Sequence, residues 1–293
     1  MAARPVVSRT RLLPAVVLAV VGLLVSGCTA HRLSQAQDAF SKAAEQENTL
    51  LPLEAPPLYA YASPYNLYLQ ADGILTKDTA DKTGDLRKEK LLGTAYALHA
   101  MTLWRLTDLS TTSEAYRRRA LEAKQKALDP ELQDQLGPRD RVMMTVLPSL
   151  MDHDTGMQHL ASGNWRRAHD FFESAFTGVD DAIKSAPQNH DVRAYLYMVE
   201  IQTLLGWRSA QLNAPADQLS QAAKDECRSR WFIPKLQTAV QELGKIRKAR
   251  GAESAEAVWD STFVRSRLEA TGFDVATVKD STVPAATRCE WRT

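Results

Sequence analysis

The chain has 293 residues with 36 basic and 35 acidic side chains, which leaves a formal net charge of +1 at pH 7. A nucleic-acid partner normally requires a basic face, so this balance argues against a nucleic-acid-binding protein. The length is sufficient for one large hydrophobic core or two moderate ones.

The first residues follow the plan of a secretory signal. Three arginines precede an apolar run over residues 12–25, namely Arg4, Arg9 and Arg11. The small residues Ser26 and Gly27 then stand directly before Cys28. This order of charged, apolar and small segments is typical of an export signal. The apolar run is shorter than the roughly 20 residues that a membrane-spanning helix needs, so a retained transmembrane anchor is the weaker interpretation.

The four residues Val25-Ser26-Gly27-Cys28 resemble the lipobox of bacterial lipoproteins. The resemblance implies that residues 1–27 are a signal peptide and that residues 28–32 form a lipidated N-terminus. Cys28 would then carry acyl chains such as palmitate, and two or more chains hold a protein stably on a bilayer. Thr29 stands where inner-membrane lipoproteins have Asp, so the resemblance implies the periplasmic face of the outer membrane. The inner membrane and the cell surface stay as alternatives.

Apolar residues recur at spacings of three and four from about residue 33 to 272, which predicts an all-α domain. One such stripe consists of Leu92, Tyr96, His99, Leu103 and Leu106. We expect helices over 33–48, 65–79, 84–108, 131–162, 164–185, 189–212, 215–230, 233–249 and 253–270, and one more from Thr111 to Pro130. Short connections favour antiparallel neighbours, so the domain should be a stack of helical hairpins.

Two segments lack this helical period. Residues 51–64 contain four prolines and form either an exposed linker or a strap across the helices. Nearby aromatic residues favour the strap, namely Tyr59, Tyr61, Tyr65 and Tyr68. The tail over residues 273–293 is expected to be irregular. It contains Cys289, which we expect to pair with Cys227 because both would lie in an oxidising compartment.

The stretch from Gly163 to Ala175 resembles the second half of a tetratricopeptide repeat. It matches that family's pattern at Gly163, Trp165, Ala168, Phe172 and Ala175. Small residues let paired helices approach while aromatic residues fill the space beside them, so the resemblance implies packing roles for these positions. Weaker matches around Ala36 and Ala120 do not fit the family's period of about 34 residues. The sequence therefore predicts a tetratricopeptide-like stack with irregular repeats.

No nucleophile motif, phosphate-binding glycine loop, paired-cysteine metal site or cofactor signature stands out in the sequence. One hairpin carries three histidines with neighbouring aspartates, namely His153, His159 and His169 with Asp152, Asp154 and Asp170. Their irregular spacing does not place the histidines on one helical face, which favours solvated or hydrogen-bonded side chains over a metal site. The basic stretch between Cys227 and Gly251 is interpreted as a solvated helix face, with an acidic partner or lipid head groups as the alternative.

These features favour a non-enzymatic scaffold or adaptor. The two resemblances imply a membrane-anchored, periplasm-facing lipoprotein that holds another protein of an envelope assembly, secretion or transport complex. The expected partners are the bilayer, through acylated Cys28, and an envelope protein, with no cofactor and no metal. The alternative is a small-molecule-binding lipoprotein associated with a periplasmic solute transporter, in which the four tyrosines near residues 51–64 would line a pocket. An enclosed cavity would favour the alternative, and an open groove would favour the scaffold.

Overall fold

The computed structural model describes residues 29–46, 58–109, 113–186, 190–217, 219–249 and 265. Every regular element in these residues is helical and none is a β-strand, so the predicted all-α class is confirmed. No helix in this part of the chain is both long and apolar enough to cross a lipid bilayer. The chain divides into two compact units, Met1–Leu136 and Gly137–Thr293.

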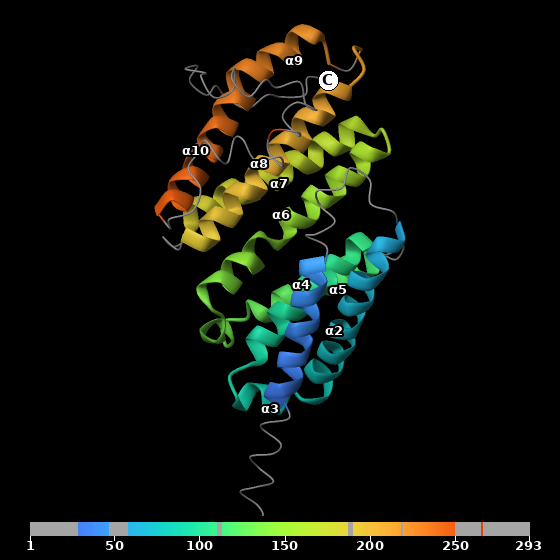
Figure 1. Ribbon diagram of the computed structural model, residues 1–293, viewed down its shortest axis with the longest axis vertical. Coiled ribbons are helices and arrows are strands. Elements are labelled where there is room, and N and C mark those ends of the chain that lie inside the picture. Colours follow the sequence, from blue (N-terminus) through green and yellow to red (C-terminus); the bar gives the residue numbers. More distant parts are fainter. Residues whose placement is uncertain are drawn as a thin grey trace, which may run out of the picture. The chain divides into compact units, whose positions relative to one another are not determined.

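The first unit is a helical bundle built around alanine-rich contacts (Figure 1). It contains a helix over residues 29–46, the 3-10 turn η1 (Leu58–Tyr61), α2 (Ala62–Asp81), α3 (Thr83–Lys88), α4 (Leu92–Leu109), α5 (Ser113–Ala127) and the 3-10 turn η2 (Gln133–Gln135). Ala36, Ala71 and Ala95 are buried with Leu75 and Leu92 in one cluster. Small side chains at these positions let the helices lie close together.

The helix predicted over 84–108 is interrupted between α3 and α4. Lys90 has a φ of 56°, the left-handed conformation that commonly ends a helix. The Leu91 amide donates to the Leu86 carbonyl at 2.8 Å, and the Lys90 amide donates to the Arg87 carbonyl at 3.1 Å. This pair of bonds is the Schellman termination, which usually uses glycine. A lysine at the left-handed position gives no such signal in the sequence.

The second unit packs three long helices against one another and continues into a fourth (Figure 1). Its elements are α6 (Pro138–Ala161), α7 (Trp165–Ser185), α8 (His190–Asn213), α9 (Gln221–Cys227), the π-helical turn η3 (Arg228–Phe232) and α10 (Ile233–Ala249). Helices α6, α7 and α8 contact one another, and α10 packs on α8. A cluster of aromatic rings fills the space between α7, α8 and η3, with Trp207 and Trp231 edge to face at 4.8 Å.

Two helices of the second unit begin later than the sequence predicts. Helix α6 begins at Pro138 rather than at residue 131, because proline is favoured in the first turn and its fixed φ suits a helix start. Helix α9 begins at Gln221 rather than at residue 215, because Ser220 caps it by accepting a hydrogen bond from the Ala223 amide at 3.3 Å. Apart from Arg265, the helix predicted over 253–270 lies outside the described residues.

The side chain of Phe172 fills a space that two neighbouring helices leave open for it. A Cβ atom added at Gly156 on α6 would lie 3.0 Å from the Phe172 ring, and one added at Gly206 on α8 would lie 2.6 Å from it. Both distances are shorter than an ordinary carbon contact. The absence of a side chain at these two glycines therefore allows α6 and α8 to close around one ring of α7.

The other residues of the predicted repeat motif belong to the same hairpin. Ala168 and Ala175 are fully buried, and Trp165 is half-buried at the start of α7. Gly163 forms the turn between α6 and α7 with a φ of 74°, which a residue with a side chain adopts only with strain. The α6–α7 hairpin thus has a tight turn, buried small residues and the buried ring of Phe172.

Replacing Phe172 with alanine should lower the free energy of unfolding by about 3–5 kcal/mol, because the change leaves a cavity between three helices. Ala168→Leu should cost about 1–3 kcal/mol, since it overpacks the same seam. Chemical denaturation followed by circular dichroism measures both losses. The matched control is Phe171→Ala, which removes a phenyl ring of equal size from a half-buried position and should lower the free energy of unfolding by less. A Phe172→Ala variant as stable as the parent would contradict this account of the packing.

Candidate functional site

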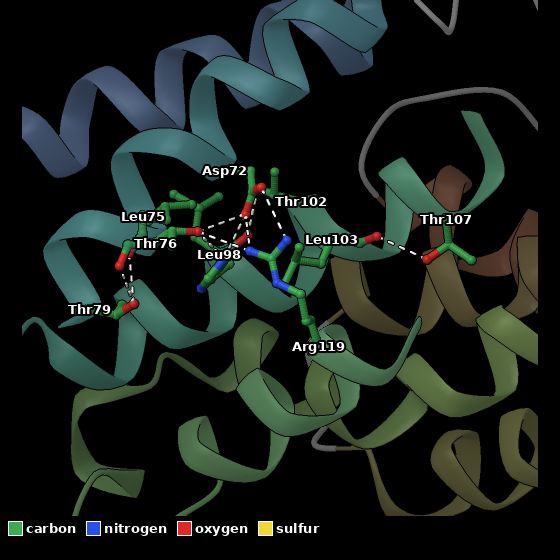
Figure 2. A network of polar contacts seen from close by, with 10 residues as sticks. Asp72, Leu75, Thr76, Thr79, Leu98, Thr102, Leu103, Thr107 and Arg119 are labelled. Atoms are coloured by element: carbon green, nitrogen blue, oxygen red, sulfur yellow. Dashed lines mark hydrogen bonds and ion pairs between the residues drawn. The ribbon is translucent and has the colours of Figure 1, made fainter. Parts of the chain in front are cut away.

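A polar network joins three helices of the first unit (Figure 2). Arg119 on α5 donates to the Asp72 carboxylate at 2.9 Å and to the Thr76 hydroxyl at 3.0 Å, both on α2. Nε2 of His99 on α4 lies 2.9 Å from the same carboxylate and 3.3 Å from the same hydroxyl. Thr76 also donates to Asp72 at 3.0 Å. His99, predicted as part of a buried stripe, is indeed buried.

The geometry of this network fits a structural clamp. Burial alone would raise the pKa of Asp72, but the hydrogen bond from His99 and the positive charge of Arg119 hold it below its ordinary value. Asp72 is therefore ionised at neutral pH. The Ser-His-Asp arrangement of hydrolases uses both ring nitrogens of the histidine, whereas here one nitrogen faces both the carboxylate and the hydroxyl. The network ties α2, α4 and α5 together.

A surface pocket of about 390 Å³ lies along the α6–α7 hairpin of the second unit. It is lined by Asp152 and His159 from α6 and by Arg167, Asp170, Phe171 and Ser174 from α7. The His159 and Phe171 rings are stacked, with centroids 5.3 Å apart and planes 15° apart. The Ser174 hydroxyl donates to the Asp152 carboxylate at 2.7 Å. The pocket therefore combines a flat aromatic wall with charged groups of both signs.

The three predicted histidines of this hairpin occupy different surroundings. His153 lies edge to face against the Phe172 ring at 5.7 Å, and its Nδ1 atom lies 3.2 Å from the Thr203 hydroxyl. His159 lines the surface pocket. His169 is 2% exposed and packs edge to face on the Trp207 ring. In the described part of the chain, no group of three or more His, Cys, Asp or Glu side chains is placed to hold a metal ion.

His169 is buried next to Asp170, one of the residues that line the pocket. Burial lowers the pKa of His169 to about 4, against the opposing charge of Asp170, so the imidazole is neutral at pH 7. Its Nδ1 atom lies 3.6 Å from the Asp170 carboxylate.

The predicted basic face of the chain is partly neutralised by acidic neighbours. Three ion pairs join Arg230 to Glu226 at 3.1 Å, Lys245 to Glu242 at 2.5 Å and Lys235 to Asp180 at 3.9 Å. Exposed pairs of this kind contribute little to stability, but they reduce the attraction to an acidic surface. The structure thus favours the solvated-face interpretation of this stretch.

The four tyrosines assigned to a strap or ligand pocket are divided between two elements. Tyr59 and Tyr61 belong to η1, which leads directly into α2, whereas Tyr65 and Tyr68 belong to α2 itself. Tyr68 is fully buried and lies edge to face against Phe40 at 5.5 Å. Tyr68 is therefore a core residue and lines no open pocket. Residues 51–57 lie outside the described residues.

The cysteine predictions are tested only in part. Cys227 is buried and disulfide-bonded, and the Gln211 amide lies 3.6 Å from its sulfur. Cys28 and Cys289, the other two cysteines of the chain, lie outside the described residues. The pairing of Cys227 with Cys289 and the lipidation of Cys28 therefore stay predictions.

A buried acidic side chain lies between α7, α8 and α10. Glu200 on α8 is 5% exposed, and burial raises the pKa of its carboxyl group to about 7. The positive charges of Lys235 and Lys184 oppose this rise, and the negative charge of Asp180 adds to it. Tyr197 also belongs to this cluster, and burial with the nearby carboxylates raises its pKa. Glu200 is the group in this cluster whose charge changes near neutral pH.

This raised pKa predicts a loss of stability between about pH 5 and pH 8. The folded state holds the Glu200 proton more tightly than the unfolded chain does. The stability that this protonated carboxyl group contributes is therefore complete below its unfolded pKa, near 4.5, and is lost as the pH rises through its folded pKa of about 7. Glu200→Gln should remove the loss and stabilise the protein at pH 8 by on the order of 2–3 kcal/mol relative to the parent. Thermal melts of the parent and of Glu200→Gln from pH 5 to pH 8 measure this difference in stability.

The control for this prediction is Glu226→Gln, which changes an exposed carboxylate of the same unit. Its melting temperature should follow that of the parent across the whole pH range. Equal pH dependence in the parent and in Glu200→Gln would show that Glu200 does not titrate differently in the folded and unfolded states.

The sequence gives no local signal for several of these contacts. Asp72 and Arg119 are 47 positions apart, and their pairing depends on how three helices pack. The contact between Asp152 and Ser174 could have been found, because an antiparallel hairpin folded at Gly163 brings residues equally far from the turn together. Asp152 stands eleven residues before Gly163 and Ser174 eleven after it.

Comparison with known proteins gives no relative for this chain, since no family model, curated protein or solved structure matches it.

Proposed function

We propose that this chain is a lipid-anchored, periplasm-facing scaffold that holds a partner protein of an envelope complex. The observation that carries the proposal is the α6–α7 hairpin. Gly156 leaves room for the Phe172 ring, and Ala168 and Ala175 are buried on the same hairpin, which supports the resemblance to a tetratricopeptide repeat. The outer side of the same hairpin carries the open pocket with charged and aromatic walls. A rigid hairpin that presents such a pocket is suited to binding an exposed segment of another protein.

The anchor in this proposal is Cys28. The lipobox resemblance at residues 25–28 supports acylation, and the helix over 29–46 begins at the next residue. An acylated Cys28 would therefore hold the first unit within a few residues of the bilayer surface. With Thr29 after the cysteine, the outer membrane is the membrane we propose. The proposal includes no catalytic step, cofactor or metal.

Lipidation is tested by mass spectrometry of the mature N-terminus from a bacterial host. We expect cleavage after Gly27 and an acylated Cys28, and we expect the protein in the membrane fraction. Cys28→Ser is the matched control and should leave the protein unprocessed or released. An unmodified Cys28 at the mature N-terminus would end the lipoprotein part of the proposal.

The scaffold part is tested by photo-crosslinking in the native envelope. Met157 on α6 and Tyr195 on α8 are large apolar residues with 39% and 36% exposure, so either can be replaced by a photoreactive phenylalanine. We expect a discrete crosslinked adduct when the photoreactive residue replaces Met157 on α6. The control position is Asn213, which is exposed at the end of α8 and should give no adduct. Identical adducts from all three positions, or none from α6 and α8, would contradict a defined partner surface on this unit.

A further inference from the structure

We infer that one end of the first unit lies directly against the headgroups of the lipid bilayer, an inference that rests on the proposed lipid anchor at Cys28. This surface, called the α3 end, consists of the last turn of α2, α3, the turn that follows α3, and residues 129–136 with η2. The inference adds to the anchor a defined orientation of the unit and names the residues that meet the lipid.

The helix over residues 29–46 begins at the α3 end (Figure 1). In its first turn, Arg32 forms an ion pair with Asp78 near the end of α2, with a nitrogen–oxygen distance of 2.9 Å. Leu33 is buried in the same hydrophobic cluster as Leu86 of α3. A polar contact and an apolar contact therefore both fix the start of this helix at the α3 end.

The chain leaves almost no slack between this point and the anchor. Cys28 stands four positions before Arg32, and four residues span at most about 14 Å even when fully extended. Residues 29 and 30 are already helical, which shortens the reach because a helix rises only about 1.5 Å per residue. The headgroup layer on one side of a bilayer is about 6 Å thick. Acyl chains on Cys28 would therefore bring the α3 end to the headgroups themselves.

The exposed side chains of the α3 end suit a headgroup layer. They include charges of both signs, namely Asp81, Arg87, Lys88, Lys90, Glu131 and Asp134. The phosphate and ammonium groups of a phospholipid such as phosphatidylethanolamine can pair with both. Leu86 and Leu132 are buried, so the surface would rest on the headgroups and not enter the hydrocarbon core. Because the two signs are mixed, the acyl anchor and not attraction to anionic lipids should hold this end in place.

The opposite end of the unit provides the reference position. Ser63 is exposed in the first turn of α2, and Asp81 is the last residue of the same helix. The helix rises about 27 Å between them, at about 1.5 Å per residue. A probe at Ser63 should therefore lie well outside the headgroup layer when a probe at the α3 end lies within it.

The test uses the mature protein, acylated in a bacterial host and reconstituted into vesicles of phosphatidylethanolamine and phosphatidylglycerol. A fluorescent amino acid replaces Lys88 or Asp134 at the α3 end, or Ser63 at the opposite end. The vesicles contain a lipid with a nitroxide on its headgroup, which quenches a fluorophore only at short range. We expect about twofold or greater quenching at Lys88 and Asp134 and little at Ser63, because the headgroup layer is only about 6 Å thick. Thermal melts check that each labelled protein is folded.

A flexible insertion supplies the matched control. About ten glycine and serine residues inserted after Thr29 add about 17 Å of root-mean-square reach and leave residues 25–29 unchanged. This protein should still float with the vesicles but should lose the quenching at Lys88. In the parent, quenching at Lys88 should persist at about 1 M salt, where the screening length falls to about 3 Å, because the short covalent link sets the distance.

An acylated protein with no quenching at Lys88, or with equal quenching at Lys88 and Ser63, would overturn the inference and leave the lipoprotein part of the proposed function intact. Quenching at Lys88 that survives the insertion, or that disappears in salt, would also overturn it, since charge and not the short link would then hold the surface. An unmodified Cys28 in the mature protein would overturn the lipoprotein part and this inference together, and mass spectrometry of the same sample separates that case from the others.

Discussion

The Phe172 ring sets the spacing of three helices in the second unit, because Gly156 on α6 and Gly206 on α8 leave room for it and for little else. A larger residue at either glycine would have to push the ring or the helix aside. Features on the surface of these helices depend on that spacing. The pocket needs α6 and α7 at a fixed separation, so that Ser174 can reach Asp152 and His159 can stack on Phe171. The buried position of Glu200 likewise depends on how α8 packs against α7 and α10.

The sequence predicts those parts of the fold that depend on local chemistry. The turn at Gly163 follows from a residue that tolerates positive φ. The bounds of α10 follow from its helical period, with Pro234 in the first turn where proline is tolerated. The break at Lys90 is missed because a lysine occupies the left-handed position that glycine usually marks. The late start of α6 is missed because residues 133–135 form a 3-10 turn, although Gly137-Pro138 marks the true beginning.

The candidate site is less predictable than the fold, because its contacts join residues far apart in the sequence. His153, His159 and His169 look like one cluster in the sequence, but antiparallel packing sends them to a helix interface, a surface pocket and a buried aromatic cluster. The clamp between Asp72 and Arg119 requires the relative rotation of α2 and α5, which no local period specifies. The pairing of Asp152 with Ser174 is an exception, since a tight turn at Gly163 fixes the register of the hairpin.

Burial decides which charged groups stabilise the fold and which can meet a partner. Asp72 is half-buried, and the hydrogen bond from His99 and the charge of Arg119 keep its pKa below the ordinary value. Arg208 is 2% exposed and donates to the Lys224 carbonyl, and burial lowers its pKa to about 10. Both groups are committed to contacts inside their unit. Asp170, by contrast, is exposed beside a neutral histidine, so its charge is available to the solvent side of the hairpin. A near-zero net charge of the whole chain is thus compatible with charged side chains that are distributed unevenly over its surface.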